Sequence, residues 1–255
     1  MLEKLSAFEE EIVHVSNTQR LSRNSSSKGN QLKWIKGKEY IKLDCLGYEG
    51  VAEYFVTKLL ECSDVRNFVK YSKCSIIEDG VKLGTGCIST DFKNGKTELT
   101  FGEILDSNLI GYSASYDEVR DIILDETGLD VKGYMDQILC LDAITMNDDR
   151  HFNNFALLYD SGGIYETAPI FDNGSSLLSD IITYPMTAPL LENMKRVQAK
   201  PFSTDFLRQL QFVTPLTLDI EKFFKSVSAK SDEEKRSLAV IENRFMITKN
   251  IAWQE

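Results

Sequence analysis

The sequence predicts an α+β fold with two lobes, a small strand-rich lobe over residues 1–92 and a mostly helical lobe over residues 93–255. Two observations support this division. Apolar residues alternate with polar ones in the first part of the chain, as in half-buried strands, whereas helical spacing dominates the second part. The chain is also long enough, at 255 residues, for one large domain or two lobes.

The first lobe contains three predicted strands and one helix. Residues 39–44 alternate as a strand, and residues 49–61 carry an apolar stripe at helical spacing. Residues 74–78 and 81–89 form two more predicted strands, joined by Asp79-Gly80. Asp-Gly is a strong signal for a tight hairpin turn, so we expect these two strands to pair.

The second lobe is predicted to hold helices at residues 117–126 and 134–146, followed by a hairpin. The hairpin strands are residues 155–159 and 164–171, and the turn between them contains two glycines. Near the end of the chain, Ser231-Asp232-Glu233-Glu234 has the form of a capping box, which predicts a helix running to Ile247.

The most informative motif lies between the second helix and the hairpin. Asp149 and Asn154 are five positions apart on a polar turn, and Asp172 follows the second hairpin strand. A hairpin would return Asp172 to the neighbourhood of Asn154. Kinases use this set of groups: one carboxylate orients the acceptor hydroxyl and takes its proton, while an amide and a second carboxylate hold Mg²⁺ on the ATP phosphates. The order of these elements therefore favours a protein-kinase-like fold that uses ATP and Mg²⁺.

A kinase also needs a lysine on a strand and a helix carboxylate that positions it. Lys42 lies on the strand at 39–44 and fits the first requirement. Glu53 borders the apolar stripe of the next helix and fits the second.

Composition narrows the classes of function and the compartment. The net charge of −10 and the pI of about 4.9 argue against direct nucleic-acid binding and against an anionic membrane surface. The five cysteines are scattered without a Cys-x-x-Cys pair, which indicates reduced thiols in a cytoplasmic protein and makes a structural zinc site improbable.

Two motifs together resemble the HipA-like family of bacterial Ser/Thr kinases, relatives of the phosphatidylinositol 3/4-kinase fold. The family's Ser-x-x-Gly-x-Gln-x-Lys loop is matched by Ser26, Gly29, Gln31 and Lys33. Its Asn-x-Asp-x-His-x-x-Asn catalytic loop is matched by Asn147, Asp149, His151 and Asn154.

The resemblance implies a role for each matching residue. Asp149 would be the catalytic aspartate, and His151 would stabilise either the loop or the transferring phosphate. Asn154 and Asp172 would bind Mg²⁺. The ATP-binding residues would be Lys42, Glu53, Ser26, Ser27, Gln31 and Lys33. Ser26 would also be the site of autophosphorylation, which in this family expels the loop and switches the kinase off.

The resemblance further implies a Ser/Thr kinase that acts on a protein substrate, as the toxin of a toxin–antitoxin pair with an antitoxin protein as partner. The chain departs from the family in being shorter than full-length HipA proteins. It departs from typical protein kinases in its metal motif, Phe171-Asp172-Asn173-Gly174, which has one residue more than Asp-Phe-Gly. Two alternatives remain open from the residues: a phosphotransferase acting on a small molecule or lipid, and a nucleotide-binding pseudokinase that regulates a partner.

Overall fold

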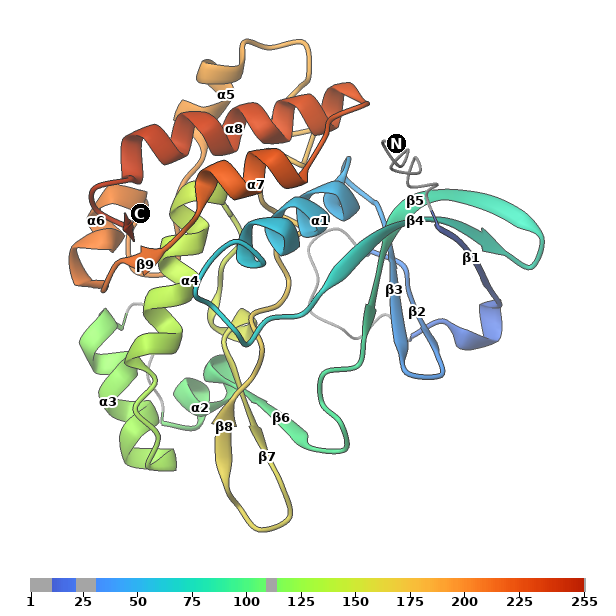
Figure 1. The fold of residues 1–255 in the computed structure, drawn as a ribbon. Helices are drawn as coiled ribbons and strands as arrows, with labels where there is room; N and C mark the ends of the chain where they lie inside the picture. The colour runs from blue at the N-terminus through green and yellow to red at the C-terminus, as the bar shows by residue number, and fades with distance from the viewer. Residues whose placement is uncertain (1–10, 22–30, 109–113, 255) are drawn as a thin grey trace, which may run out of the picture.

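A computed structural model describes residues 11–21, 31–108 and 114–254, and it has the mixed α+β architecture that the sequence predicts. Its first part is a curled five-stranded sheet, seen on the right of Figure 1. The strands are β1 (Glu11–Val15), β2 (Lys33–Lys36), β3 (Glu39–Leu43), β4 (Tyr71–Glu78) and β5 (Val81–Thr90). Their spatial order is β1-β4-β5-β3-β2, with β1 parallel to β4 and the other pairs antiparallel.

The predicted hairpin between β4 and β5 is confirmed. Asp79 and Gly80 both have positive φ, 47° and 86°, as the tight turn that suits strand twist requires. One face of the sheet has a small core of its own, built from Val13, Val15, Trp34, Ile41, Cys74, Ile76 and Ile88.

Within the described residues, the only α-helix of the sheet region is α1 (Glu49–Leu60), which packs against β4 and β5. The helix comes very close to the sheet where two glycines meet. A Cβ atom built on Gly50 would lie 2.5 Å from the backbone of Gly86, and one built on Gly86 would lie 2.0 Å from the carbonyl oxygen of Lys42. A side chain at position 50 would therefore push α1 away from β5, and one at position 86 would force β5 away from the backbone of Lys42 on β3.

The second part of the chain is mainly helical (Figure 1). Its helices are α2 (Phe101–Ser107), α3 (Tyr116–Thr127), α4 (Lys132–Thr145), α5 (Leu190–Arg196), α6 (Phe206–Gln209), α7 (Ile220–Ser226) and α8 (Asp232–Thr248). The predicted helix at the end of the chain is confirmed as α8, and Ser231 and Glu234 form the predicted capping box. Short 3-10 turns occupy Asn17–Gln19, Phe152–Asn154 and Leu210–Phe212.

A three-stranded sheet, β6-β7-β8, accompanies these helices, and it differs from the predicted hairpin in one respect. The strands are β6 (Thr97–Thr100), β7 (Ala156–Tyr159) and β8 (Tyr165–Thr167), and a separate parallel pair joins β9 (Leu216–Thr217) to β10 (Trp253–Gln254). The predicted strand at 164–171 ends at Thr167 because Pro169, which has no backbone N–H, follows. The backbone of Ile170 then forms hydrogen bonds with Asn67 and Val69, in the segment that leads into β4. The chain therefore leaves the hairpin, and Asp172 lies next to the five-stranded sheet, where it contacts Lys42 of β3.

The two parts of the chain share a large core. The apolar side of α1, including Ala52, Phe55 and Leu59, lies in the same cluster as the buried residues of α4 and α8. The predicted boundary after residue 92 falls in the connection between β5 and β6 and stays a prediction. Within the described residues, no helix is long and apolar enough to cross a membrane.

Candidate active site

A cleft lies between the five-stranded sheet and the helical part of the chain. One region of it has a volume of about 870 Å³, and its walls include Tyr40, Tyr71, Phe92 and Phe171. Both this region and an adjoining deeper one are bordered by Lys42, Asn154 and Asp172. The cleft therefore has aromatic walls beside a charged floor, a combination that suits a ligand with a flat ring and a polar tail.

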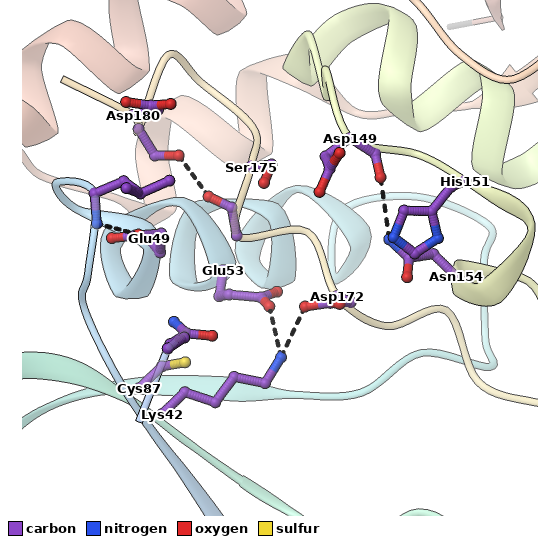
Figure 2. Close-up of a pocket in the computed structure, with 14 residues that line it drawn as sticks. Lys42, Glu49, Glu53, Cys87, Asp149, His151, Asn154, Asp172, Ser175 and Asp180 are labelled. Carbon is purple, nitrogen blue, oxygen red and sulfur yellow. Dashed lines mark hydrogen bonds and ion pairs between the residues drawn. The ribbon is translucent and has the colours of Figure 1, made fainter. Parts of the chain in front are cut away.

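Lys42 is the central charged group of the cleft (Figure 2). Its Nζ lies 2.9 Å from Oδ1 of Asp172 and 3.5 Å from Oε1 of Glu53. Lys42 comes from β3 and Glu53 from α1, where it is 1% exposed. Oε2 of Glu53 also accepts a hydrogen bond of 3.0 Å from the backbone N–H of Asn173. Glu53 thus holds both the lysine and the loop that follows Asp172.

The electrostatics of this group keep Lys42 and Asp172 charged. Burial alone would lower the pKa of Lys42, but the neighbouring Asp172 carboxylate and the other negative groups nearby reverse the effect and hold that pKa well above its ordinary value. Burial alone would raise the pKa of Asp172, but Lys42 and Lys33 hold it well below its ordinary value. Burial raises the pKa of Glu53, and Lys42 opposes that rise.

The backbone at Asp172 is unusual because its φ is +57°, in the left-handed region that non-glycine residues rarely adopt. Such a conformation costs free energy and persists where surrounding contacts impose it. Here the neighbouring contacts are the ion pair with Lys42 and the hydrogen bond from Asn173 to Glu53.

The predicted catalytic loop begins where α4 ends, at Thr145, and passes through Met146 with a φ of 55°. The backbone N–H of Asp149 donates to Oδ1 of Asn147 at 3.0 Å, and Nδ2 of Asn154 donates to the carbonyl oxygen of Asp149 at 3.3 Å. Asp149, His151 and Asn154 all line the deeper region of the cleft together with Asp172 (Figure 2). The structure therefore brings the two predicted loops to one site.

The side-chain oxygens at this site suit a hard divalent cation. Asn154 uses its amide nitrogen on the Asp149 carbonyl, so its Oδ1 is the atom left to face a cation. Asp172 supplies an ionised carboxylate next to it in the cleft. Oxygen ligands of this kind, with remaining positions filled by water and phosphate, are those that Mg²⁺ takes in nucleotide sites. The residues present therefore fit Mg²⁺.

Arg150 is a part of the site that the sequence argument missed. It is completely buried and makes a two-pronged ion pair with Asp142 of α4, at 2.9 and 3.0 Å. It also donates to the carbonyl oxygen of Phe171 at 3.1 Å and to Oδ1 of Asn173 at 2.7 Å. Arg150 thus joins the predicted catalytic loop to the residues on both sides of Asp172. The signal in the sequence was an aspartate, Asp142, within the otherwise apolar second half of α4.

Two predicted binding residues after the Ser-rich segment also border the cleft. Gln31 lines the deeper region, and Lys33 lines the larger one directly across the β2–β3 pair from Lys42. Burial and the nearby Lys42 lower the pKa of Lys33. Ser26 and Ser27 lie outside the described residues.

Comparisons with known proteins agree with this architecture. No family profile matches the chain, and no curated protein sequence matches it. Among solved structures, the chain is similar to the Helicobacter pylori proinflammatory kinase CtkA, with a TM-score of 0.65 and 16% identity over 88% of this chain and 93% of that one. It is also similar to HipA from a Shewanella oneidensis complex of HipA, HipB and operator DNA, with a TM-score of 0.50 and 11% identity over 88% of this chain and 65% of that one. At these identities the likeness shows the fold alone, a mixed α+β architecture that this chain shares with both proteins.

Proposed function

We propose that the protein is an ATP- and Mg²⁺-dependent Ser/Thr protein kinase of HipA-like type. The observation that carries the proposal is the position of Lys42, which bridges Asp172 and Glu53 at the floor of a cleft that also contains Asp149 and Asn154. This arrangement supports the proposal, because it gathers a cation that can bind phosphates, two candidate metal ligands and a candidate base around one space. A pseudokinase would not need the carboxylates at positions 149 and 172.

The roles follow from the contacts. Lys42 and Lys33 bind the phosphates of ATP, whose base occupies the larger, aromatic-walled region of the cleft. Mg²⁺, held by Asn154 and Asp172, neutralises phosphate charge when it is bound. Asp149 orients the acceptor hydroxyl and takes its proton as the new bond forms between the acceptor oxygen and the γ-phosphorus. The bond from that phosphorus to the β–γ bridging oxygen breaks, and ADP leaves.

Autophosphorylation of Ser26 is part of the proposal. Leu21 and Gln31, the described residues on either side of the Ser-rich segment, both line the cleft. Ser26 is five residues from Gln31, and five residues of extended chain reach about 17 Å. The distance does not prevent Ser26 from meeting the γ-phosphate. A phosphoserine would add about −1.5 to −2 charges and compete with ATP for Lys33 and Lys42, so modification should reduce activity.

The proposal extends to the biological setting. The fold shared with HipA supports a toxin role with an antitoxin protein as partner. Within the described residues, which include all five cysteines, none forms a disulfide, and this supports a cytoplasmic location. Co-purification of the tagged protein with the product of a neighbouring gene would test the partnership.

The test of the kinase itself is a time course with Mg-ATP, followed by peptide mass spectrometry, on the wild type and Asp149→Asn. We expect phosphate on Ser26, or failing that on Ser25 or Ser27, in the wild type alone. Phosphate in both proteins would indicate a contaminating kinase. Absence from both, with no transfer to any protein substrate, would refute the proposal.

A further inference from the structure

The segment that follows the metal-binding loop returns to the catalytic loop at Lys200. Nζ of Lys200 lies 3.3 Å from Oδ1 of Asp149. The backbone just before Lys200 is well anchored, because Val197 and Ala199 are buried in the large core and the N–H of Ala199 donates to the carbonyl oxygen of Thr204 at 3.0 Å. The position of Lys200 beside Asp149 is therefore built into the fold.

A second cation, Arg196, is linked to the same loop through Tyr184. Arg196, the last residue of α5, lies with its Cζ 5.8 Å from the centre of the Tyr184 ring. The hydroxyl of Tyr184 in turn donates to Oδ2 of Asp148 at 2.6 Å, next to Asp149 in the sequence. Arg196 and Lys200 are both exposed, and neither lines the two regions of the cleft that contain Lys42. Lys200 thus contacts the predicted catalytic loop directly, and Arg196 reaches it through Tyr184, both outside the space proposed for ATP.

Lys200 keeps capacity for another negative group. Its side chain is 48% exposed, whereas that of Asp149 is 19% exposed. An ammonium group has three N–H donors, and Asp149 provides one carboxylate oxygen within reach. A side chain that arrives together with the acceptor hydroxyl would meet these remaining donors.

We propose that the acceptor is an acidic peptide segment, with Asp or Glu within two residues of the Ser or Thr that is phosphorylated, and that Lys200, assisted by Arg196, selects it. This inference rests on the kinase function proposed above. Charge complementarity around a cleft is a general source of specificity, because an unmatched charge loses the interaction and a like charge is repelled.

The test compares three peptides that share one central serine and differ only in the two positions on each side, which are all Glu, all Gln or all Lys. The measured quantity is the ratio of kcat/KM values, because a ratio is insensitive to a general loss of rate. We expect the wild type to favour the Glu peptide over the Gln peptide by about 10-fold, which is worth about 1.4 kcal/mol. Lys200→Ala should reduce the preference to about 3-fold or less, and Lys200→Glu should favour the Lys peptide.

Lys225 provides the matched control. It is an exposed lysine on α7 that also pairs with a carboxylate, Glu221, at 3.1 Å. Lys225→Ala and Lys225→Glu should leave the peptide preference unchanged. Because Lys200 is half exposed, its replacement should not unfold the protein, and the thermal melting curve of each variant checks this.

Each outcome decides the matter. Equal rates on the three peptides, phosphorylation of the protein itself but of no peptide, or a wild-type preference that survives Lys200→Glu would overturn the inference and leave the kinase function standing. Absence of phosphoryl transfer to any acceptor, the protein itself included, would overturn both.

Discussion

Replacement of Arg150 should cost more stability than any other change of a single charged residue near the cleft. Arg150 and Asp142 are both 0% exposed, and their two contacts of 2.9 and 3.0 Å satisfy charges that water cannot reach. Arg150→Met would leave the Asp142 carboxylate buried without its partner and would remove the donors to Phe171 and Asn173. Breaking a buried pair in this way costs about 3–5 kcal/mol.

That loss is a large part of the protein's total free energy of unfolding, which for a domain is ordinarily about 5–15 kcal/mol. For a chain of this size each kcal/mol shifts the melting temperature by about 2–4 °C, so Arg150→Met should melt about 6–20 °C below the wild type. Urea denaturation at neutral pH, followed by circular dichroism, measures the free energy of unfolding directly.

A second arginine–aspartate pair in the chain has the same geometry as Arg150–Asp142 but is exposed, so it serves as a control for the effect of burial. Arg120 makes an equally two-pronged pair with Asp130, at 3.0 and 3.0 Å, but both side chains are substantially exposed. Arg120→Met should change stability little, because solvent screens an exposed ion pair. A loss for Arg150→Met no larger than the loss for Arg120→Met would refute the argument from burial.

A double variant separates the two functions of Arg150. The double variant Asp142→Leu, Arg150→Met has neither charge of the buried pair. It should therefore recover at least half of the stability that Arg150→Met alone loses. Phosphoryl transfer should not return, because the contacts from position 150 to Phe171 and Asn173 remain absent. Recovery of both properties together would show that Arg150 does not position the loop around Asp172.

Three further predictions concern the floor of the cleft. Asp172→Ala should abolish the Mg²⁺-dependent part of ATP affinity, and calorimetry that shows equal wild-type affinity with Mg²⁺ and with EDTA would contradict the metal site. Gly86→Ala should lower the free energy of unfolding by about 1–3 kcal/mol, because the new Cβ would lie 2.0 Å from the Lys42 carbonyl oxygen. The control is Gly133→Ala, whose Cβ would have nothing within 4 Å. In thermal melting this variant should be as stable as the wild type or slightly more stable. The pKa of Asp172 lies well below its ordinary 3.8, because Lys42 and Lys33 outweigh burial. The ion pair of Asp172 with Lys42 therefore stabilises the folded protein above pH 3.8, and this stabilisation is lost as the pH falls towards the lowered pKa of Asp172. The difference in unfolding free energy between the wild type and Lys42→Met should thus be largest near neutral pH and shrink as the pH falls into the acid range, because the carboxylates of Asp172 and Glu53 take up protons more readily without Lys42; a difference that persists in acid would contradict the ion pair.

Local signals predicted a substantial part of the fold. The Asp-Gly turn, the apolar stripe of α1 and the capping box of α8 each depend on residues that are close in sequence, and all three are present. The short strands β1 and β2 were not predicted. β1 is only five residues long and pairs in parallel with β4, about sixty positions later, so its strand character depends on tertiary structure.

The same distinction applies to the site. Lys42, Glu53 and Asp172 could be proposed because kinases need these residue types in this order, and the structure places them in contact. Contacts made by Arg150 and Lys200 could not be foreseen, because their partners depend on how helices and loops pack. A buried arginine and a surface lysine look alike in a sequence.

The central claim is that the cleft around Lys42 transfers the γ-phosphoryl group of ATP with Asp149 as the base. Its most direct test is a single-turnover measurement with Mg-ATP labelled at the γ-phosphate, carried out on the wild type and Asp149→Asn, with ATP affinity measured on the same samples. The exchange of a carboxylate for an amide is nearly isosteric, so ATP affinity should stay within about 3-fold, while the transfer rate should fall by a factor of about 10² or more because general-base catalysis is lost. Transfer by Asp149→Asn at a rate near that of the wild type would contradict the claim.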